Sequence, residues 1–466
     1  MTTPRRTLIR NGWVLTQDPQ LGELDGADVL IEGTTIRAVG PRLAVDDAAV
    51  IDATDMIVLP GFVDAHRHVW QTQLRTIAGD WTLFDYSCRM RFRYSACYDA
   101  DDTYLGNYVG RLEALAAGIT TVVDHCHILN SPEHVDAAIQ GLRDSGGRSL
   151  FCYGLFANPK YPSMELEMTP GWRCDDARRV RRDVLAADDA LVTMGLAPEE
   201  VDYIPFESVR QQIELARELG ARRISCHVAM GNYDRGTRVA EALAQAGLLR
   251  DDVLFVHGAA LTDGELQQIA DAGASIVATP ETEMQMGMGH PVVARALAKG
   301  ANAALGIDIV SNYSGDMFAP MRLQLQAQRA AEHREHGRPP RRLRLQTRDV
   351  LALATRAGAR AAGLDALCGS LTPGKQADVI LLRTDAIHMT PVIDAAGAVV
   401  LNANASDVDT VMAGGRVVKR QGTLVDVDWP RVSKRLRQSS RKILQRAESI
   451  PVEPIEALVG SMMLDQ

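Results

Sequence analysis

Two histidines separated by one residue, His66 and His68, are the clearest sign of chemistry in this sequence. They end the segment "LPGFVDAHRH", in which an apolar run follows a Pro-Gly turn. Side chains at positions i and i+2 of a β-strand point to the same side, so both imidazoles can reach one metal ion. Such a pair also arises by chance, and its surroundings decide whether it forms a site.

The elements that must position these histidines alternate between apolar strand-like runs and amphipathic helical stretches. Helical patterns such as "SVRQQIELARELGA" separate eight candidate strands: Gly61–His66, Thr120–Asp124, Ser149–Leu155, Leu191–Ala197, Arg223–His227, Val253–His257, Ser275–Thr279 and Ala303–Asp308. This alternation predicts an α/β fold, a parallel TIM (β/α)8 barrel. A doubly wound sheet is the alternative, but no glycine-rich phosphate loop follows the first strand.

Polar side chains gather where these candidate strands end. They are His66, His68, Asp124, His125, His227, His257, Glu281, Glu283 and Asp308. The C-terminal ends of barrel strands form the catalytic face of a TIM barrel, so the placement itself points to function. Taken singly, His227 or His257 is equally well a hydrogen-bonded core histidine, and Asp308 is equally well a helix cap.

The two ends of the chain predict a second, smaller domain. Residues 1–59 and 366–425 are rich in short strand patterns and turn residues, and they are expected to pair into one small β-sandwich. Residues 60–365 are expected to form the barrel. Residues 426–466 read as a basic amphipathic helix and a tail, to which no chemistry is assigned.

The composition restricts the binding partners. The net charge of −9 argues against a nucleic-acid surface. The seven cysteines are scattered without a CxxC pair, which is typical of reduced thiols in a cytoplasmic enzyme. No stretch has the length and apolar character of a signal peptide or a membrane span, so no membrane association is expected.

Longer motifs give the chain a resemblance to the amidohydrolase superfamily, in the group of triazine hydrolases, cytosine-type deaminases and S-adenosylhomocysteine deaminases. The motifs are "PGFVDAHRHVWQTQLR", "EALAAGITTVVD", "ISCHVAMG", "VHGAALTDGELQQIADAGASIVATP", "GIDIVSNYSGDMF" and "LTPGKQADVILL". The resemblance implies that His66, His68, His227 and Asp308 bind a metal ion. It also implies that Asp308 is the general base, that His257 polarises the attacked group, and that the protein is a homo-oligomer.

Elementary metal chemistry agrees with this donor set. Three imidazoles and one carboxylate suit a divalent ion, with Zn²⁺ favoured over Fe²⁺ or Co²⁺, and leave one position for water. Two-metal relatives use a bridging lysine near the fourth strand, where "LVTMGLAPEE" has none. Lys160 is the nearest candidate and is not assigned as a bridge. One metal ion is therefore expected.

Two departures from the family pattern affect the expected reaction. Deaminases of this group carry a glutamate three residues after the fifth-strand histidine, where this chain has Met230, which cannot transfer a proton. Relatives carry "PTSNM" where this chain reads "PETEM", which adds Glu281 and Glu283. These two carboxylates either restore an acid, or bind a cationic substrate, or form ion pairs in a loop. Metal binding by His125 and His127 is not expected, because the family's second strand gives no ligand.

The loop after the first barrel strand, Val69–Asp102, contains many of the few aromatic residues. In a TIM barrel such loops build the substrate pocket. Gln71, Arg75 and Trp81 fall where relatives contact substrate, although the aromatic residues would equally well pack a subunit interface.

The sequence therefore predicts a metal-dependent hydrolase that cleaves a non-peptide C–N bond of a small cyclic or aromatic molecule. Met230 favours an amide, urea, carbamate or amidine as the substrate group. One alternative is an aminohydrolase (a deaminase or dechlorinase) of a purine, pyrimidine or triazine-like ring, in which Glu281 or Glu283 would be the proton shuttle of a deaminase. The others are a nonhydrolytic metal-dependent reaction and a non-catalytic barrel subunit.

Overall fold

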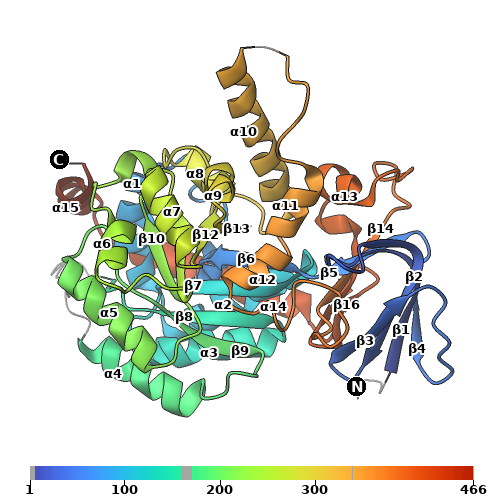
Figure 1. The fold of residues 1–466 in the computed structure, drawn as a ribbon. Coiled ribbons are helices and arrows are strands. Elements are labelled where there is room, and N and C mark those ends of the chain that lie inside the picture. The colour runs from blue at the N-terminus through green and yellow to red at the C-terminus, as the bar shows by residue number, and fades with distance from the viewer. Residues whose placement is uncertain (1–5, 159–170, 338, 465–466) are drawn as a thin grey trace.

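The computed structural model describes residues 6–158 and 171–464, except residue 338. Two sheets organise these residues (Figure 1). The larger unit is a barrel of eight strands: β6 (Phe62–Arg67), β7 (Ile119–Cys126), β8 (Arg148–Gly154), β9 (Val192–Ala197), β10 (Ile224–Val228), β11 (Val253–His257), β12 (Ser275–Ala278) and β13 (Asn302–Leu305). They pair in chain order and in parallel, as the eight apolar runs predicted.

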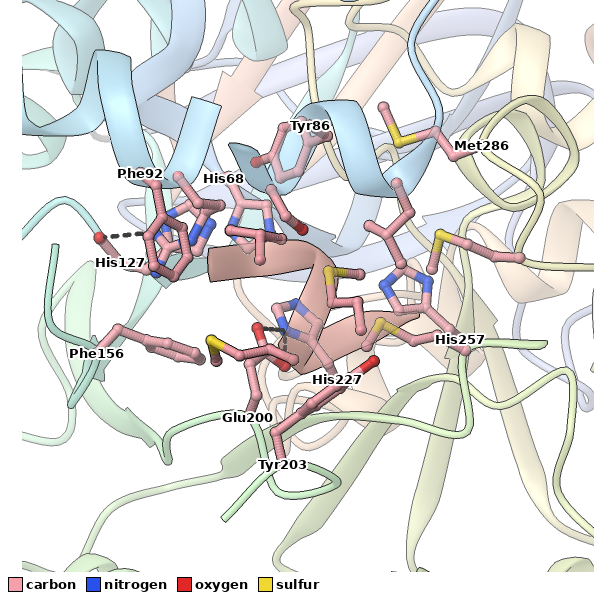
Figure 2. Close-up of a pocket in the computed structure, with 18 of the residues that line it drawn as sticks. His68, Tyr86, Phe92, His127, Phe156, Glu200, Tyr203, His227, His257 and Met286 are labelled. Atoms are coloured by element: carbon pink, nitrogen blue, oxygen red, sulfur yellow. Dashed lines mark hydrogen bonds and ion pairs between the residues drawn. The ribbon is translucent and has the colours of Figure 1, made fainter. Parts of the chain in front are cut away.

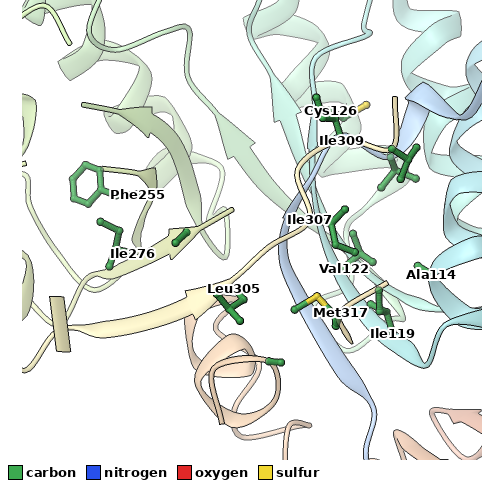
Figure 3. Close-up of a cluster of buried hydrophobic side chains, with 14 of the residues drawn as sticks. Ala114, Ile119, Val122, Cys126, Phe255, Ile276, Leu305, Ile307, Ile309 and Met317 are labelled. Atoms are coloured by element: carbon green, nitrogen blue, oxygen red, sulfur yellow. The ribbon is translucent and has the colours of Figure 1, made fainter. Parts of the chain in front are cut away.

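Helices follow the barrel strands and cover the outside of the barrel (Figure 1). They are α2 (Ala100–Ala116), α3 (Pro132–Ser145), α4 (Gly171–Arg179), α5 (Phe206–Glu218), α6 (Val239–Gln245), α7 (Asp263–Asp271), α8 (Pro280–Gln285), α9 (Val293–Ala298), α10 (Phe318–His336), α11 (Thr347–Leu353) and α12 (Arg356–Ala361). Every residue of β7 is buried, because both faces of a parallel barrel strand are covered. Figure 3 shows Ile119 and Val122 of β7 near Ala114 of α2 in this core.

The loop after β6 contains short helical segments rather than one long helix. These are η1 (Val69–Leu74), α1 (Leu83–Tyr86), the π-helical segment η2 (Ser87–Tyr94) and η3 (Ser95–Cys97). All six residues of η1 are buried.

Both ends of the chain form a second sheet. It contains β1 (Arg6–Leu15), β2 (Glu23–Glu32), β3 (Thr35–Gly40), β4 (Ala49–Asp52), β5 (Met56–Pro60), β14 (Val379–Arg383), β15 (Val408–Ala413), β16 (Arg416–Arg420) and β17 (Thr423–Leu424). The ends meet where β5 pairs antiparallel with β14, with Val58 opposite Leu381. The predicted joining of the two ends is confirmed, as one hydrogen-bonded sheet with its own apolar core.

A buried ion pair connects the two units. Arg148, at the start of β8, donates from Nη2 and Nε to Oδ2 of Asp378 at 2.9 and 3.1 Å. The other carboxylate oxygen of Asp378 accepts the N–H of Gly414 at 3.0 Å. Because the two side chains pair with each other and both oxygens of Asp378 accept hydrogen bonds, the buried charges are tolerated at the interface between barrel and sheet.

Two helices end the described chain, α14 (Trp429–Glu448) and α15 (Glu453–Met463). The predicted basic helix corresponds to α14, whereas α15 was expected only as a tail. The expected boundaries after residues 59, 365 and 425 lie at the end of β5, after α12 and after β17. No helix in the described part of the chain combines the length and hydropathy needed to cross a membrane.

Candidate metal centre

The last barrel strand and the first meet through the candidate ligands themselves. The N–H of Asp308 donates to the carbonyl oxygen of His66 at 2.9 Å, and the N–H of His68 donates to the carbonyl oxygen of Asp308 at 2.7 Å. Strand β13 ends at Leu305, earlier than predicted, and Asp308 follows it with a φ of 70°. The chain therefore bends out of the strand and brings the Asp308 carboxylate over the two histidines.

Four side chains converge at this end of the barrel. Nε2 of His66 lies 3.3 Å from Nε2 of His227 and 3.4 Å from Oδ1 of Asp308. Nε2 of His68 lies 3.3 Å from the same Asp308 oxygen. Tetrahedral ligands held ~2.0–2.1 Å from a Zn²⁺ ion are about 3.3–3.4 Å apart. These three donor pairs therefore have the spacing of ligands on one divalent ion: His66, His68 and Asp308 form one potential ligand group, and His227 contacts it through His66.

Hydrogen bonds to the second ring nitrogens aim two of these imidazoles inward. Nδ1 of His68 lies 2.7 Å from the carbonyl oxygen of His125 and thus donates to it. Nδ1 of His227 lies 3.1 and 3.2 Å from the two carboxylate oxygens of Glu200. A proton held on Nδ1 leaves Nε2 with its lone pair free, which is the form that a metal ligand requires.

The electrostatics of the cluster favour the same protonation states. Burial lowers the pKa of His66 to about 4, although Asp308 opposes this shift. Burial alone would raise the pKa of Asp308, but its hydrogen bond to His66 and the adjacent His68 hold that pKa below its ordinary value. At neutral pH His66 thus offers a neutral imidazole and Asp308 an ionised carboxylate, the forms that bind divalent ions.

His257, at the end of β11, lies beside the cluster. Together with His66 and His227 it forms a second group of potential ligands. Its Nδ1 lies 3.1 Å from Oγ1 of Thr279 and 3.4 Å from Oε1 of Glu283. Burial would lower its pKa, but the bond to Glu283 and the charge of Asp308 raise it. Its φ of 73°, like that of Asp308, is a backbone conformation that concentrates at functional sites.

A cavity opens above these residues. Its polar floor contains His68, His227, His257 and Asp308, and Glu200 lies at its side. Aromatic and methionine side chains form most of its walls: Tyr86, Phe92, Phe156, Tyr203, Met230, Met286, Met288, Met462 and Met463. Figure 2 shows Tyr86 and Met286 on one side of the histidines and Glu200 and Tyr203 on the other. The arrangement suits a flat, largely apolar molecule whose polar end reaches the metal ligands.

The residues predicted to contact substrate are distributed unevenly. Met230 lines the cavity. Gln71 is buried behind the wall, where its Nε2 donates to the hydroxyl of Tyr86 at 2.6 Å. Arg75 points outward to Glu113, with 2.7 Å between Nη1 and Oε1. Trp81 stacks on Tyr94 outside the lining residues.

The two glutamates of "PETEM" also lie outside the cavity lining. Glu283 is completely buried beneath the floor, where it accepts the N–H of Thr279 at 2.7 Å and faces His257. Burial raises the pKa of Glu281 to about 8, and Asp316 adds to this shift. Oε2 of Glu281 is buried without a hydrogen-bond partner. Glu283 thus orients His257, and neither carboxylate faces the cavity.

Some lining residues were not anticipated. Glu200 follows the fourth strand in "LAPEE", and a carboxylate at a strand end was a signal that could have identified it. The wall from α15 had no signal in the sequence, because its residues are more than 140 positions beyond Asp308.

The second histidine pair lies beside the candidate ligands. His127 stacks on His68 at a centroid distance of 3.9 Å, but neither His125 nor His127 belongs to a potential ligand group among the described residues. Lys160 lies outside the described residues.

Comparisons with known proteins place the chain among metal-dependent hydrolases. The chain is 28% identical over 94% of its length to a 5-methylthioadenosine/S-adenosylhomocysteine deaminase of Desulforudis audaxviator, of which 99% is covered. It is 27% identical over 95% of its length to a 5'-deoxyadenosine deaminase of Methanosarcina mazei, again with 99% covered.

Solved structures share the fold. A zinc-bound adenosine deaminase from Xanthomonas campestris matches with a TM-score of 0.82 at 23% identity, over 94% of this chain and 98% of that one. An atrazine chlorohydrolase from Arthrobacter aurescens, complexed with zinc, matches with a TM-score of 0.82 at 24% identity, over 93% of this chain and 100% of that one. The family model described as "Amidohydrolase family" matches residues 57–418, which span the barrel and all four candidate ligands. The chain belongs to the amidohydrolase family and is a metal-dependent hydrolase of C–N bonds other than peptide bonds.

Proposed function

We propose that this protein uses one Zn²⁺ ion to hydrolyse a C–N bond on a small, flat, mostly apolar ring molecule and releases ammonia or an amine. The observation that carries the proposal is a cluster of three imidazoles and one carboxylate beside an aromatic-walled cavity. His66 lies 3.3 Å from His227 and 3.4 Å from Asp308, and His68 lies 3.3 Å from Asp308.

In this proposal His66, His68, His227 and Asp308 hold the ion. When bound, the ion supplies a water molecule made acidic enough to lose its proton near neutral pH. Asp308 is the general base, because its carboxylate is ionised and faces the cavity, and it returns the proton to the departing nitrogen. His257 lies at the floor with its Nδ1 side bound to Thr279 and Glu283, so its other nitrogen is directed to the substrate. There it stabilises negative charge on the attacked group.

The aminohydrolase version of this reaction is supported by the relatives. The two curated relatives are named as deaminases of adenine nucleosides, and the zinc-bound structural neighbours are named for adenosine and atrazine, both of which contain flat nitrogen heterocycles. The aromatic and methionine walls of the cavity suit such a ring.

Cleavage of an amide, urea, carbamate or amidine is the second candidate. Met230 lines the cavity at the position where deaminases of this group carry a proton-transferring glutamate. A leaving amine that accepts its proton from Asp308 needs no second acid, and this reaction therefore tolerates a methionine there.

The test compares purified wild-type protein with His227→Ala and with His333→Ala, a control at an exposed position of α10. We expect about one zinc per chain in the wild type and in the control, and loss of zinc in His227→Ala. A panel of amino-substituted heterocycles and aryl amides is then scored for ammonia and for amine release. Turnover confined to the zinc-loaded proteins supports the proposal. Full zinc without any release contradicts it.

Three finer points accompany the proposal. Zinc is favoured over iron or cobalt by the donor set. A cytoplasmic location is supported by the cysteines, all seven of which are free and six of which are buried. A homo-oligomer is proposed from the family resemblance, and size-exclusion chromatography with light scattering tests it.

A further inference from the structure

The C-terminal helix α15 forms one wall of the cavity above the donor cluster. Val459, Met462 and Met463 of this helix line the cavity. The match to the family model ends at residue 418, so α15 lies beyond the residues that this model matches. Figure 1 shows α15 beside α1, at the end of the barrel away from the nine-stranded sheet.

Two arginines from different barrel loops hold α15 in place. Nη2 of Arg89, in η2 after β6, lies 3.3 Å from Oε1 of Glu456. Nη1 of Arg235, after β10, donates to the carbonyl oxygen of Met462 at 2.6 Å. This carbonyl belongs to the last turn of α15, where no further helical N–H is present to bond it. The helix α15 is thus anchored to two loops, the one after β6 and the one after β10, at the end of the barrel where the cavity lies.

The contact at Arg235 also connects α15 to the cavity wall. The Arg235 guanidinium lies 5.8 Å from the ring centroid of Tyr203, which lines the cavity. The hydroxyl of Tyr203 donates to the carbonyl oxygen of Tyr233 at 3.0 Å. On the inner side of α15, Ile455 and Val459 are buried in the main apolar core. The helix is therefore a fixed part of the site.

The chemistry of the cavity differs between its two ends. The ionisable side chains that line the cavity come from the barrel and its loops and include the histidines, Asp308, Glu199, Glu200 and Arg91, whereas α15 contributes only apolar side chains. Methionine side chains are flexible and polarisable, and they adapt to apolar groups of varied shape. Met230, Met286 and Met288 extend this apolar surface from the barrel loops.

We infer that α15 sets the substrate's size by binding an apolar substituent, with Met462 and Met463 as specificity-determining residues. The inference rests on the proposed metal-dependent function, and it deepens that function by naming the substrate class. The substrate carries its C–N bond at one end and an apolar group of several carbons, directed at α15, at the other.

The test measures binding of benzohydroxamic acid and 4-butylbenzohydroxamic acid to zinc-loaded protein by titration calorimetry. A hydroxamate chelates the metal ion and places its tail in the cavity without being turned over. Each buried methylene is worth about fourfold in affinity. Met463→Ala should therefore increase the preference for the butyl compound by about three- to tenfold, and Met463→Trp should reduce it by a similar factor. Met462→Ala is a second enlarging variant.

Leu464→Ala is the matched control, because Leu464 is exposed next to Met463 and does not line the cavity. Its preference should equal that of the wild type, and circular dichroism checks that each variant is folded. If all folded variants that bind hydroxamate keep the wild-type preference for the butyl compound, the role of α15 is overturned and the proposed function is not. A zinc-loaded wild type that binds neither hydroxamate overturns the proposed function, and the role of α15 with it.

Discussion

Asp308 contacts His66 twice, once through the backbone and once through the side chain. Its N–H donates to the His66 carbonyl oxygen at 2.9 Å, and its Oδ1 lies 3.4 Å from His66 Nε2. The first contact closes the barrel between its last and first strands, and the second contributes to the donor cluster. Closure of the fold and assembly of the metal site therefore depend on the same pair of residues.

Metal removal should consequently destabilise the fold. A ligand present at a hundred times its Kd stabilises the native state by about 2.7 kcal/mol. Dialysis against a chelator should lower the Tm by roughly 3 °C, because the unfolding entropy of a chain of 466 residues corresponds to about 1 °C per kcal/mol. Differential scanning fluorimetry with and without added Zn²⁺ checks this. Asp308→Asn should show little response to zinc, while His333→Ala should respond like the wild type. Identical Tm values for metal-free and zinc-loaded wild type would contradict the prediction.

The barrel could be predicted because its strands follow local sequence patterns. Each strand is a short apolar run with a polar residue at its end, and the burial of β7 on both faces requires such a run. His66, His68, His227 and Asp308 lie near one another because the C-terminal ends of parallel barrel strands meet on one face.

Glu200 should strengthen metal binding through His227. Its carboxylate accepts from Nδ1 of His227 at 3.1 Å and holds the ring with Nε2 toward the cluster. Loss of such an outer partner typically weakens metal affinity by about 10- to 100-fold. Glu200→Gln should therefore release zinc more readily to a competing chelator, whereas Glu448→Gln, at an exposed position of α14, should not. Equal zinc affinity in the two variants would remove Glu200 from this role.

The sequence could not predict the directions of the side chains in the loop after β6 or the cavity wall formed by α15. Gln71, Arg75 and Trp81 lie in the expected loop, but Gln71 points to Tyr86 and Arg75 to Glu113. A loop of short helical turns has no single periodicity from which its inward face can be read. The wall from α15 depends on a long-range contact, because its residues are distant in the chain from the loops that anchor them.

The ion pair between Arg148 and Asp378 should be essential for joining the barrel to the sheet. Both side chains are almost completely buried, and breaking such a pair leaves an unpaired buried charge. Asp378→Ala should lower the free energy of unfolding by about 3–5 kcal/mol. The exposed pair of Arg178 and Glu218 provides the comparison, and Glu218→Ala should cost less than about 1 kcal/mol. Urea unfolding followed by circular dichroism measures both, and similar losses in the two variants would argue against the prediction.

Glu281 should make stability depend on pH in the alkaline direction. Its pKa is raised from 4.5 to about 8 in the native state, chiefly by burial. As pH rises between these values the unfolded chain loses this proton while the native state keeps it, so stability falls. Glu281→Gln removes the ionisation and should raise the Tm relative to wild type at pH 8.5 but barely at pH 4.5. Glu448→Gln is the exposed control. A Tm difference between Glu281→Gln and wild type that does not change with pH would refute this assignment.

A close approach of α2 to η1 should support His68, the candidate metal ligand that precedes η1. A Cβ atom at Gly110, in α2, would overlap the carbonyl oxygen of Val69, which directly follows His68. The backbone of η1 is buried, so the helix and the loop must separate for an alanine to fit. Gly110→Ala should therefore lower the Tm and weaken zinc binding together, because the displaced loop carries His68 with it.

Gly264→Ala in α7 is the matched control. The nearest atom to its added Cβ is Oγ1 of Thr262 at 3.8 Å, and alanine is favoured over glycine in a helix by about 1 kcal/mol. Gly264→Ala should thus keep or raise the Tm with zinc binding unchanged, and a Gly110→Ala protein that loses stability but binds zinc normally would show that η1 does not position His68.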